Sequence, residues 1–552
     1  MISTRCRLSL YPWKRHHLLR HSQQKCLHTS LRLEHKYFVT TPIFYVNAAP
    51  HLGHLYTAVL ADALTRWQRL VGNETLFSTG TDEHGLKVQQ AASKNKVEPL
   101  EYCNQVSALF KRLFENANIG YDDYIRTTEP RHKESVQWFW ERLDDAGCIY
   151  KDRYEGWYCV TDECYLSEDE VTDSTDGEGN KIKVSVESGN PVTWMTEDNY
   201  KFRLSQFTDR LSAWLDSGVI HPSKFEAMVR RWVEDLPELS VSRPSDRLPW
   251  GIPVPGDPSQ TIYVWLDALV NYLTVAGFPG KITNWPPDCQ IIGKDILRFH
   301  AVYWPAFLMA AGMDPPKRLL VHSHWMVDGF KMSKSRRNVV DPVKQMSTLS
   351  ADGLRYFLMK EGVPHSDGNY SDAKAVECVN SDLVNTLGNL LSRCTSAAIN
   401  PRQVFTEPSS RSLVQDLSRD EQAAFSQLND LPDIVAEHYE NVSIYKSLDA
   451  IMRQLNSANA LMQHHQPWQL AKSNSASSRQ HLDTVVHVAM ETLRRCGILL
   501  QPVTPGVSDK LLSRLGISPD SRRLVNAKSA WPCESDLGPT TSVLLKRIDR
   551  QR

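Results

Sequence analysis

Two short segments of the chain carry side chains that are suited to holding phosphate groups. The first, His51–His54, reads His-Leu-Gly-His and lies between a β-prone run and an amphipathic helix. A helix N-terminus offers unpaired N–H groups and a positive dipole end, and imidazoles can donate hydrogen bonds to phosphate oxygens. Gly53 has no Cβ, so a flat ring or a phosphate can approach its backbone closely. This segment predicts a nucleotide-phosphate site, with a helix that merely begins with two histidines as the alternative.

The second segment, Lys331–Ser335, reads Lys-Met-Ser-Lys-Ser and follows Gly329. Two lysines with small residues between them, in a loop flanked by glycine, can form a mobile cationic clamp for a polyphosphate. A solvated basic loop is the alternative for this segment taken alone. The chain has neither the Gly-x-x-x-x-Gly-Lys-Ser/Thr pattern nor the Gly-x-Gly-x-x-Gly pattern, which argues against P-loop nucleotidases and nicotinamide enzymes.

An alternation of strands and helices positions both segments. The spacing of apolar residues predicts a long helix after the first segment, through Leu55, Val59, Leu60, Ala63, Leu64, Trp67 and Val71. Further strands are predicted at 37–41, 75–79, 290–292 and 319–321, and the second of them runs into the polar turn Gly80–Gly85. Such an alternation predicts a parallel, doubly wound sheet, in which ligands bind at the carboxyl ends of the strands.

A β-rich stretch from about residue 150 to 260 interrupts this alternation, and helices dominate after residue 384. Cys159 and Cys164 lie in that stretch with the spacing C-x₄-C, while the next histidine is His221 and the next cysteine is Cys289. A structural zinc site needs four ligands. We therefore expect no zinc in this stretch, and no bound metal of the protein's own.

The composition is that of a globular protein with several domains: 552 residues, 41% hydrophobic and 23% charged, with eleven scattered cysteines that fit a reducing compartment. No run of 18 apolar residues predicts a membrane span. Residues 1–33 hold five arginines, two lysines and no acid, so removing these seven charges from the net −1 leaves about −8. This segment predicts a mitochondrial transit peptide, with a basic nucleic-acid-binding arm as the alternative.

Taken together, the two segments resemble the paired signatures of the class I aminoacyl-tRNA synthetases. From residue 36 to about 550 the chain is similar to the methionyl-tRNA synthetases, in the motifs TTPIFYVNAAPHLGH, GTDEHG, YVWLDALVNYL, IIGKDILRFH, FKMSKS and NLLSR…PW. The resemblance implies an α/β fold: a Rossmann-like parallel sheet split by a β-rich connective insertion and followed by an α-helical anticodon-binding domain. It also implies that Mg²⁺-bound ATP activates L-methionine to an adenylate, from which the 3′ end of tRNA(Met) takes the methionyl group.

The resemblance further assigns roles to individual residues. It implies catalysis by His51, His54, Lys331 and Lys334. It implies ATP binding by these four residues together with Gly53, Arg243 and Asp295. It implies methionine binding by Ile43, Tyr45, Asp82, Trp265, Ala268, Tyr272, Ile296, Phe299 and His300. Anticodon reading falls to Asn389, Arg393 and Trp468, since an indole can stack on an unstacked base while amide and guanidinium groups read base edges.

The expected organisation has six parts: a transit peptide (1–35), the first half of the catalytic domain (36–149), the insertion (150–260), the second catalytic half (261–325), the signature loop with a linking segment (326–384) and the anticodon-binding domain (385–552). We expect a monomer in the mitochondrial matrix, without membrane contact. Three other functions stay open at this point: another class I synthetase, a non-catalytic RNA-binding or splicing factor on the same fold, and a small-molecule nucleotidylyltransferase.

Overall fold

The computed structural model describes residues 36–159, 164–166, 168–176, 179–186, 188–332, 338–406, 417–530, 534–540 and 543–549. Residues 37–552 cluster as one compact unit, separate from residues 1–36. The predicted transit peptide and Lys334 lie outside the described residues. In the described part of the chain, we find no helix with the length and apolar character of a membrane span.

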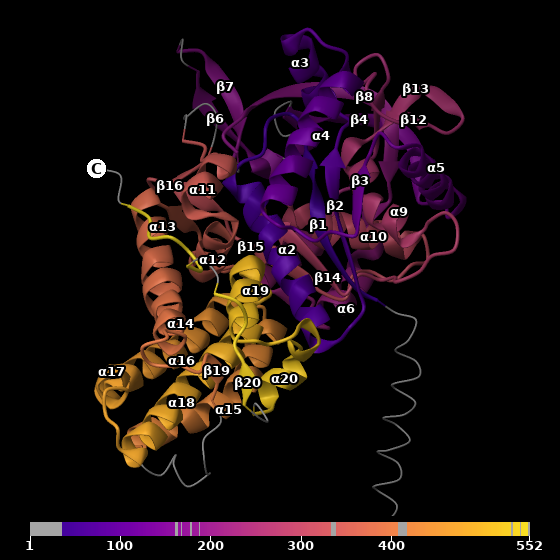
Figure 1. The fold of residues 1–552 in the computed structure, drawn as a ribbon. Helices are drawn as coiled ribbons and strands as arrows, with labels where there is room; N and C mark the ends of the chain where they lie inside the picture. Colours follow the sequence, from indigo (N-terminus) through magenta and orange to yellow (C-terminus); the bar gives the residue numbers. More distant parts are fainter. Residues whose placement is uncertain are drawn as a thin grey trace, which may run out of the picture. The chain divides into compact units, whose positions relative to one another are not determined.

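A six-stranded sheet forms the centre of the compact unit (Figure 1). Its order is β3-β2-β1-β14-β15-β9, and every neighbouring pair is parallel. The strands are β1 (Tyr37–Tyr45), β2 (Thr75–Asp82), β3 (Asp123–Arg126), β9 (Ile220–His221), β14 (Cys289–Gly293) and β15 (Leu319–His322). The predicted parallel sheet is confirmed.

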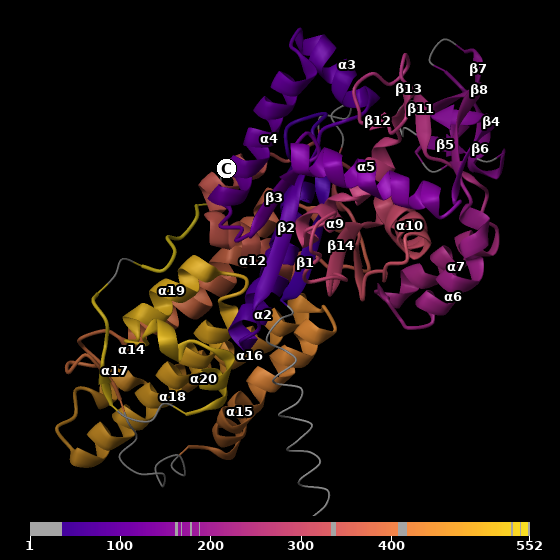
Figure 2. The ribbon, with the colours of Figure 1, turned by 90° about the vertical axis from the view of Figure 1, so that its right-hand side faces the viewer.

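Helices cover both faces of the sheet, as Figure 2 shows from the side. Successive side chains of a strand point to opposite faces, and so Ile291 and Leu320 join one hydrophobic core while Ile292 and Val321 join another. The first core includes α2 (Leu52–Val71) and α4 (Pro99–Asn116). The second includes α5 (Pro130–Asp145), α6 (Thr208–Leu215), α7 (Glu226–Glu234), α8 (Val264–Leu269), α9 (Asn271–Ala276) and α10 (Trp304–Ala310).

Helix α2 follows the predicted apolar pattern with one exception. Leu55, Val59, Leu60, Ala63, Leu64 and Trp67 are buried, but Val71 is 46% exposed because it is the last residue of the helix. The helix ends at Gly72, whose φ of 107° is favourable for glycine and costly for other residues.

A second, antiparallel sheet interrupts the main sheet in the chain. Its order is β5-β4-β8-β7-β6, with β10 paired to β8. The strands are β4 (Ile149–Cys159), β5 (Cys164–Leu166), β6 (Val171–Thr175), β7 (Lys181–Ser185), β8 (Pro191–Phe202) and β10 (Leu239–Ser240). Strand β9 also lies within the range 150–260, yet it extends the parallel sheet by pairing with β15.

Three small sheets complete the β structure. The first contains β11 (Ser242–Pro244), β12 (Pro253–Val254) and β13 (Asp257–Ile262). The second contains β16 (Trp325–Val327), β17 (Phe330–Lys331) and β18 (Gly368–Tyr370), and it carries the start of the Lys-Met-Ser-Lys-Ser segment. The third pairs β19 (Val404–Phe405) with β20 (Ser535–Asp536). Helix α3 (Leu86–Asn95) follows residues 83–85; Gly80, Thr81 and Asp82, predicted as part of a polar turn, belong to β2 instead.

The described C-terminal region is helical, as predicted. Its helices are α11 (Pro342–Leu349), α12 (Ala351–Glu361), α13 (Asp372–Cys378), α14 (Asn389–Cys394), α15 (Arg419–Glu440), α16 (Ile444–His465), α17 (Pro467–Leu470), α18 (Ala476–Leu500), α19 (Pro505–Arg514) and α20 (Leu524–Lys528). A π-helical segment, η6 (Val379–Gly388), joins α13 to α14. Asn385 therefore lies on a wider turn than the α-helical spacing predicted, although Asn385, Asn389 and Arg393 are all exposed.

Candidate active site

The segments that carry the predicted site residues meet at one edge of the parallel sheet. Strands β1 and β14 are neighbours in the sheet although roughly 250 residues separate them in the chain. The chain continues from β1 and from β14 to opposite sides of the sheet. Open α/β sheets bind ligands at the carboxyl ends of two such strands. The His-Leu-Gly-His segment follows β1, and Asp295 follows β14.

The side chains of His51 and His54 cap the N-terminus of α2. The Gly53 N–H donates to Nδ1 of His51 at 3.0 Å, and the His51 N–H donates to Nδ1 of His54 at 3.1 Å. Because both Nδ1 atoms accept, each neutral ring carries its proton on Nε2. The sequence predicted unpaired N–H groups at this terminus. Instead, the Gly53 N–H donates to the side chain of His51, which precedes the helix.

The two imidazoles form a compact stack. Their ring centroids are 3.8 Å apart, and His54 also contacts Phe44 and Phe110 at 5.3 Å each. Burial and the neighbouring His51 hold the pKa of His54 well below its ordinary value. A Cβ on Gly53 would lie 2.9 Å from Cε1 of His51, so the glycine makes room for the capping ring. The result is a fixed pair of neutral hydrogen-bond donors.

Two contacts tie this first turn of α2 to distant parts of the chain. The Leu52 N–H donates to the Val340 carbonyl at 3.2 Å, just after the Lys-Met-Ser-Lys-Ser segment. Nε2 of His322, at the end of β15, lies 2.8 Å from the Thr57 hydroxyl, while its Nδ1 lies 3.0 Å from the Ser323 carbonyl. Burial lowers the pKa of His322 to about 4, so the ring is neutral and accepts from Thr57. These contacts fix the histidine pair relative to the second signature segment.

Asp295 and Lys331, both predicted ATP ligands, are brought together. The Lys331 ammonium lies 3.9 Å from Oδ2 of Asp295, and Nε2 of His324 lies 3.4 Å from Oδ1. Desolvation opposes ionisation of Asp295, but His324 and Lys331 outweigh it and hold its pKa below the ordinary value. The Lys331 side chain is 63% exposed. So loose and exposed a pair contributes little to stability, which leaves the ammonium able to turn toward a bound anion.

Four of the nine predicted methionine-binding residues form two neighbouring aromatic pairs. Trp265 and Phe299 stack with centroids 3.7 Å apart and an interplanar angle of 17°. The Tyr272 hydroxyl lies 2.8 Å from Nε2 of His300, whose Nδ1 lies 2.9 Å from the Ile296 carbonyl. Burial lowers the pKa of His300 to about 4, so this ring is neutral: its Nδ1–H donates to the carbonyl and Nε2 accepts from the tyrosine.

The remaining predicted methionine ligands sit nearby in the fold. Tyr45 and Asp82 are directly paired at the ends of β1 and β2, next to the Ile43–Gly80 pair. Asp82 is buried, as is Ala268 on α8 between Trp265 and Tyr272. A buried carboxylate at the end of a central strand is a suitable partner for an ammonium group.

Arg243, another predicted ATP ligand, is held by contacts within the protein. It is 4% exposed on β11, and its Nη1 donates to the Ser240 hydroxyl at 2.8 Å and to the Ser242 carbonyl at 2.7 Å. Its guanidinium also lies over the rings of Tyr165, at 4.9 Å, and Tyr263, at 4.5 Å. These contacts hold it between the antiparallel sheet and β13, where it lines a cavity of about 20 Å³.

A buried network missed by the sequence reasoning supports the aromatic pairs. Asp267, two residues after Trp265, lies 2.6 Å from Nδ1 of His84 and 2.8 Å from Nε2 of His132, whose Nδ1 lies 3.0 Å from the Thr274 hydroxyl. Desolvation opposes ionisation of Asp267, but the two histidines lower its pKa to about 2. The sequence offered one signal of this network. Asp267 is an acid within the apolar run Val264–Leu269, and a buried carboxylate requires partners.

The predicted anticodon readers lie on two helices of the C-terminal region. Asn389 and Arg393 are exposed on α14, and Trp468 is partly exposed on α17. Both helices pack against α18, and Figures 1 and 2 both draw α17 beside α14. A stacking surface and two polar side chains can therefore face the same ligand.

Comparisons with known proteins agree on one family. A family model described as "tRNA synthetases class I (M)" matches residues 37–395. The chain is 51% identical to the human mitochondrial methionine–tRNA ligase over an alignment of 540 residues that covers 93% of this chain and 91% of that protein. It is 42% identical to the probable mitochondrial methionine–tRNA ligase of Schizosaccharomyces pombe over 506 residues, 90% and 92% of the two chains.

Solved structures give the same result for the fold. The Mycobacterium tuberculosis methionyl-tRNA synthetase in complex with methionyl-adenylate superposes with a TM-score of 0.87 at 40% identity, covering 93% of this chain and 100% of that one. The apo form from the same organism superposes with a TM-score of 0.81 at 37% identity, covering 94% and 99%.

Proposed function

Because the chain belongs to the methionyl-tRNA synthetase family of class I aminoacyl-tRNA synthetases, we propose that it activates L-methionine with ATP and transfers the methionyl group to tRNA(Met). The observation that carries this function is the 51% identity, over 93% of the chain, to a methionine–tRNA ligase. The site geometry supports it, since the histidine pair and the Asp295–Lys331 pair lie at the sheet edge where nucleotides bind.

In the first step, the methionine carboxylate attacks the α-phosphate of ATP, which enters as its Mg²⁺ complex, and pyrophosphate leaves. No bond to the protein forms, so the protein contributes positioning and charge stabilisation. The Nε2–H groups of His51 and His54 donate to phosphate oxygens. Lys331 and Lys334 neutralise the charge that grows on the leaving pyrophosphate, and Asp295 orients Lys331 until ATP arrives.

The amino acid lies against the aromatic pairs. The Trp265–Phe299 stack and the Tyr272–His300 pair offer flat, polarisable surfaces that suit a thioether, and Asp82 binds the α-ammonium group. Ile43, Tyr45, Ala268 and Ile296 complete the walls. Since burial keeps His300 neutral and the contacts with Ile296 and Tyr272 fix its ring, it presents no charge to the apolar side chain of methionine.

In the second step, the 3′-terminal ribose of the tRNA attacks the adenylate carbonyl and AMP leaves. The helical region from residue 385 onward recognises the anticodon through Asn389, Arg393 and Trp468. The stretch 150–260 is the connective insertion between the catalytic halves 36–149 and 261–325, and 326–384 links the signature loop to the helices. Arg243, held at the end of the insertion, contributes a positive charge to the ATP site.

Amino-acid-dependent ATP–pyrophosphate exchange, measured with each of the twenty amino acids, tests the proposed function. We expect exchange with methionine and near-background exchange with the others. The assay also distinguishes the three other functions: exchange with a different amino acid would indicate another synthetase, and no exchange with any would indicate a non-catalytic factor or a nucleotidylyltransferase.

Replacing Trp468 with alanine should impair tRNA charging while methionine-dependent exchange stays within about twofold of wild type. Stacking of one base contributes roughly 1–3 kcal/mol, so charging efficiency should fall by up to about a hundredfold. Asn389→Ala and Arg393→Ala alter only exposed side chains and should act in the same direction. Arg231→Ala, an exposed arginine of α7, is the matched control. Equal losses in charging and exchange would mean that Trp468 supports the fold and does not read RNA.

The curated relatives are mitochondrial enzymes, and we propose that this chain works as a monomer in the mitochondrial matrix. Residues 1–35 fused to a fluorescent protein should carry it into the matrix, because seven basic and no acidic residues precede Glu34. Changing the five arginines of this segment to glutamine should abolish import. A fusion that stays in the cytosol would contradict the predicted address.

A further inference from the structure

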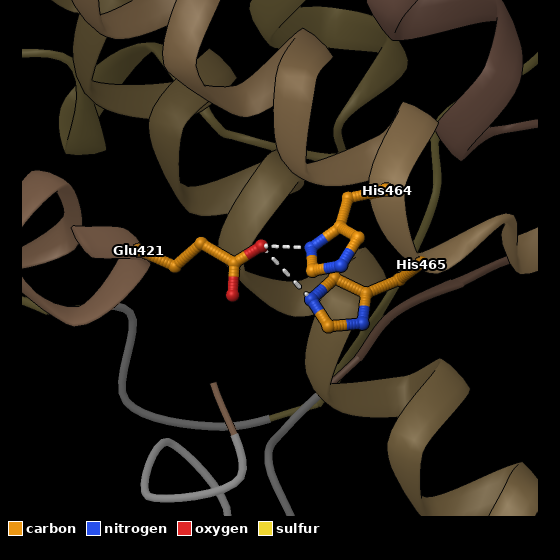
Figure 3. A group of neighbouring side chains, drawn as sticks. All are labelled: Glu421, His464 and His465. Atoms are coloured by element: carbon orange, nitrogen blue, oxygen red, sulfur yellow. Dashed lines mark hydrogen bonds and ion pairs between the residues drawn. The ribbon is translucent and has the colours of Figure 1, made fainter. Parts of the chain in front are cut away.

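A cluster of three metal-binding side chains lies in the helical region, far in sequence from the adenylation site (Figure 3). Glu421 belongs to the first turn of α15, and His464 and His465 are the last two residues of α16. Their ligand atoms all lie within 4.8 Å of one another. In the figure the carboxylate points between the two imidazoles.

Hydrogen bonds already converge on one oxygen of this cluster. Oε1 of Glu421 lies 2.8 Å from Nδ1 of His464 and 3.1 Å from Nε2 of His465. Nδ1 of His465 lies 2.9 Å from Nε2 of His481, which belongs to α18. The other carboxylate oxygen, Oε2, accepts from the Ser418 N–H and hydroxyl and so caps α15. Four side chains thus connect the ends of three helices.

We propose that Glu421, His464 and His465 bind one divalent transition-metal ion, with zinc the best chemical fit. Two imidazoles and a carboxylate form a ligand set that zinc uses with a fourth position left to water. His464 is 68% exposed, which leaves that position open to solvent, whereas Glu421 and His465 are only 15% and 12% exposed. The site therefore has two firmly held ligands and one accessible ligand through which an ion can enter.

Two of the three distances between ligand atoms fit a metal with little movement. With metal–ligand distances of about 2.0–2.1 Å, the ligand atoms of a tetrahedral site are roughly 3.3 Å apart. The two nitrogen–oxygen distances of 2.8 and 3.1 Å need to open by only a few tenths of an ångström. Desolvation opposes ionisation of Glu421, but the hydrogen bonds from His464, Ser418 and His465 lower its pKa to about 2, so the oxygen ligand is anionic.

His481 completes the site without touching the ion. When a metal occupies Nε2 of His465, the proton of that ring must move to Nδ1, from where it can donate to Nε2 of His481. Similarly, the proton of His464 moves from Nδ1 to Nε2. A hydrogen bond from the far nitrogen of a liganding histidine is the usual support of such sites.

This inference revises the sequence-based expectation of a metal-free protein. That expectation rested on Cys159 and Cys164, which lack two further ligands, and on the absence of a linear ligand motif. Here Glu421 is 43 residues from His464, and only the packing of α15 against α16 brings them together. The ion would join α15 to α16 and, through His481, to α18 beside the short helix that carries Trp468.

Cobalt is a suitable probe, because tetrahedral Co²⁺ absorbs visible light and zinc does not. The full-length chain without an affinity tag is treated with a chelator and titrated with Co²⁺, and Zn²⁺ then displaces the cobalt. We expect saturation at one ion per chain. Metal should also raise the thermal unfolding temperature, because an ion that binds only the folded chain stabilises it.

The variants separate this site from other metal-binding groups. Glu421→Gln keeps a side chain that can cap α15 but removes the anionic ligand, and His465→Gln removes a nitrogen ligand; each should lower cobalt affinity by at least about a hundredfold. His481→Gln should lower it by about 10–100-fold. His438→Gln, a partly exposed histidine of α15 outside the cluster, should leave binding unchanged.

Saturable cobalt binding that persists in Glu421→Gln and His465→Gln would overturn the proposal, as would binding that Cys159→Ser removes, or the absence of a one-to-one complex in the wild type. Because none of these measurements uses tRNA, methionine or ATP, their outcome is independent of the proposed ligase function.

Discussion

Replacing Lys334 with alanine is expected to slow methionyl-adenylate formation by about 10²–10³-fold and to leave methionine binding nearly unchanged. Lys334 itself lies outside the described residues, but the loop begins in a defined place. Gly329, with a φ of 78°, turns the chain from β16 into β17, and Lys331 at the end of β17 lies 3.9 Å from Asp295. Three residues further on, a second ammonium can reach the same bound polyphosphate.

The expected selectivity follows from when the charge develops. Negative charge on the pyrophosphate oxygens grows as the bond to the α-phosphate breaks, so an ammonium beside them interacts more strongly in the transition state than in the ground state. Only such interactions raise the rate of the chemical step. Lys334→Arg should recover part of the lost rate, because a planar guanidinium does not reproduce a compact point charge.

Single-turnover adenylate formation, measured beside equilibrium methionine binding, decides this prediction. Lys344→Ala, an exposed lysine of α11 beyond the loop, is the control and should match wild type in both measurements. Abolished methionine binding with a chemical step within about twofold of wild type would show that Lys334 belongs to the amino-acid pocket and does not act on pyrophosphate.

The sequence predicted the local features of this site well. The strands and the long helix after His54 depend on residue spacing over a few positions, and the structure has them, although β2 continues to Asp82 where the sequence predicted a turn. The resemblance supplied the choice of site residues, most of which lie along one edge of the sheet. Val71 was expected to be buried, because periodicity alone does not show where a helix ends.

The contacts that hold these residues in place were not predictable from spacing. The pairs Thr57–His322 and His84–Asp267 join positions 265 and 183 residues apart, so they depend on how the layers pack. The contact between Glu421 and His464 also depends on packing, because 43 residues separate them. For Arg243 the resemblance implies ATP binding, which stays a prediction, and the structure adds the hydrogen bonds to Ser240 and Ser242 that hold its side chain at β11.

Arg355→Met is expected to destabilise the protein by about 3–5 kcal/mol, because it removes the buried one of the two cations that bind Asp62 and leaves buried backbone carbonyls without their donor. The Arg355 side chain is 1% exposed, and its Nη2 donates to Asp62 of α2 at 2.6 Å. It also donates to the Val503 carbonyl at 2.8 Å and the Pro502 carbonyl at 2.9 Å, at the end of α18. One guanidinium thus joins the helix that carries the histidine pair to the C-terminal helices.

Urea denaturation provides the measurement, with the transition midpoint followed by circular dichroism and by loss of methionine-dependent exchange. Both midpoints should fall together in Arg355→Met, because the ion pair lies between the two regions that these signals report. Exchange activity per folded molecule should stay near the wild-type value, since Arg355 contacts no residue of the proposed ATP or methionine site.

A second arginine that binds Asp62 provides the control for the Arg355 prediction. Asp62 also binds Arg66, one helical turn further along α2, through Nε at 2.7 Å, but the Arg66 side chain is 23% exposed. Water can replace that partner, so Arg66→Met should cost no more than about 1 kcal/mol. Combining Arg355→Met with Asp62→Asn should cost less than the sum of the single changes. Asp62→Asn removes the buried negative charge from which Arg355→Met takes its buried partner. If Arg66→Met and Arg355→Met shifted the midpoint equally, burial would not be the source of the stabilisation, and Arg355 would be only one more surface contact of Asp62.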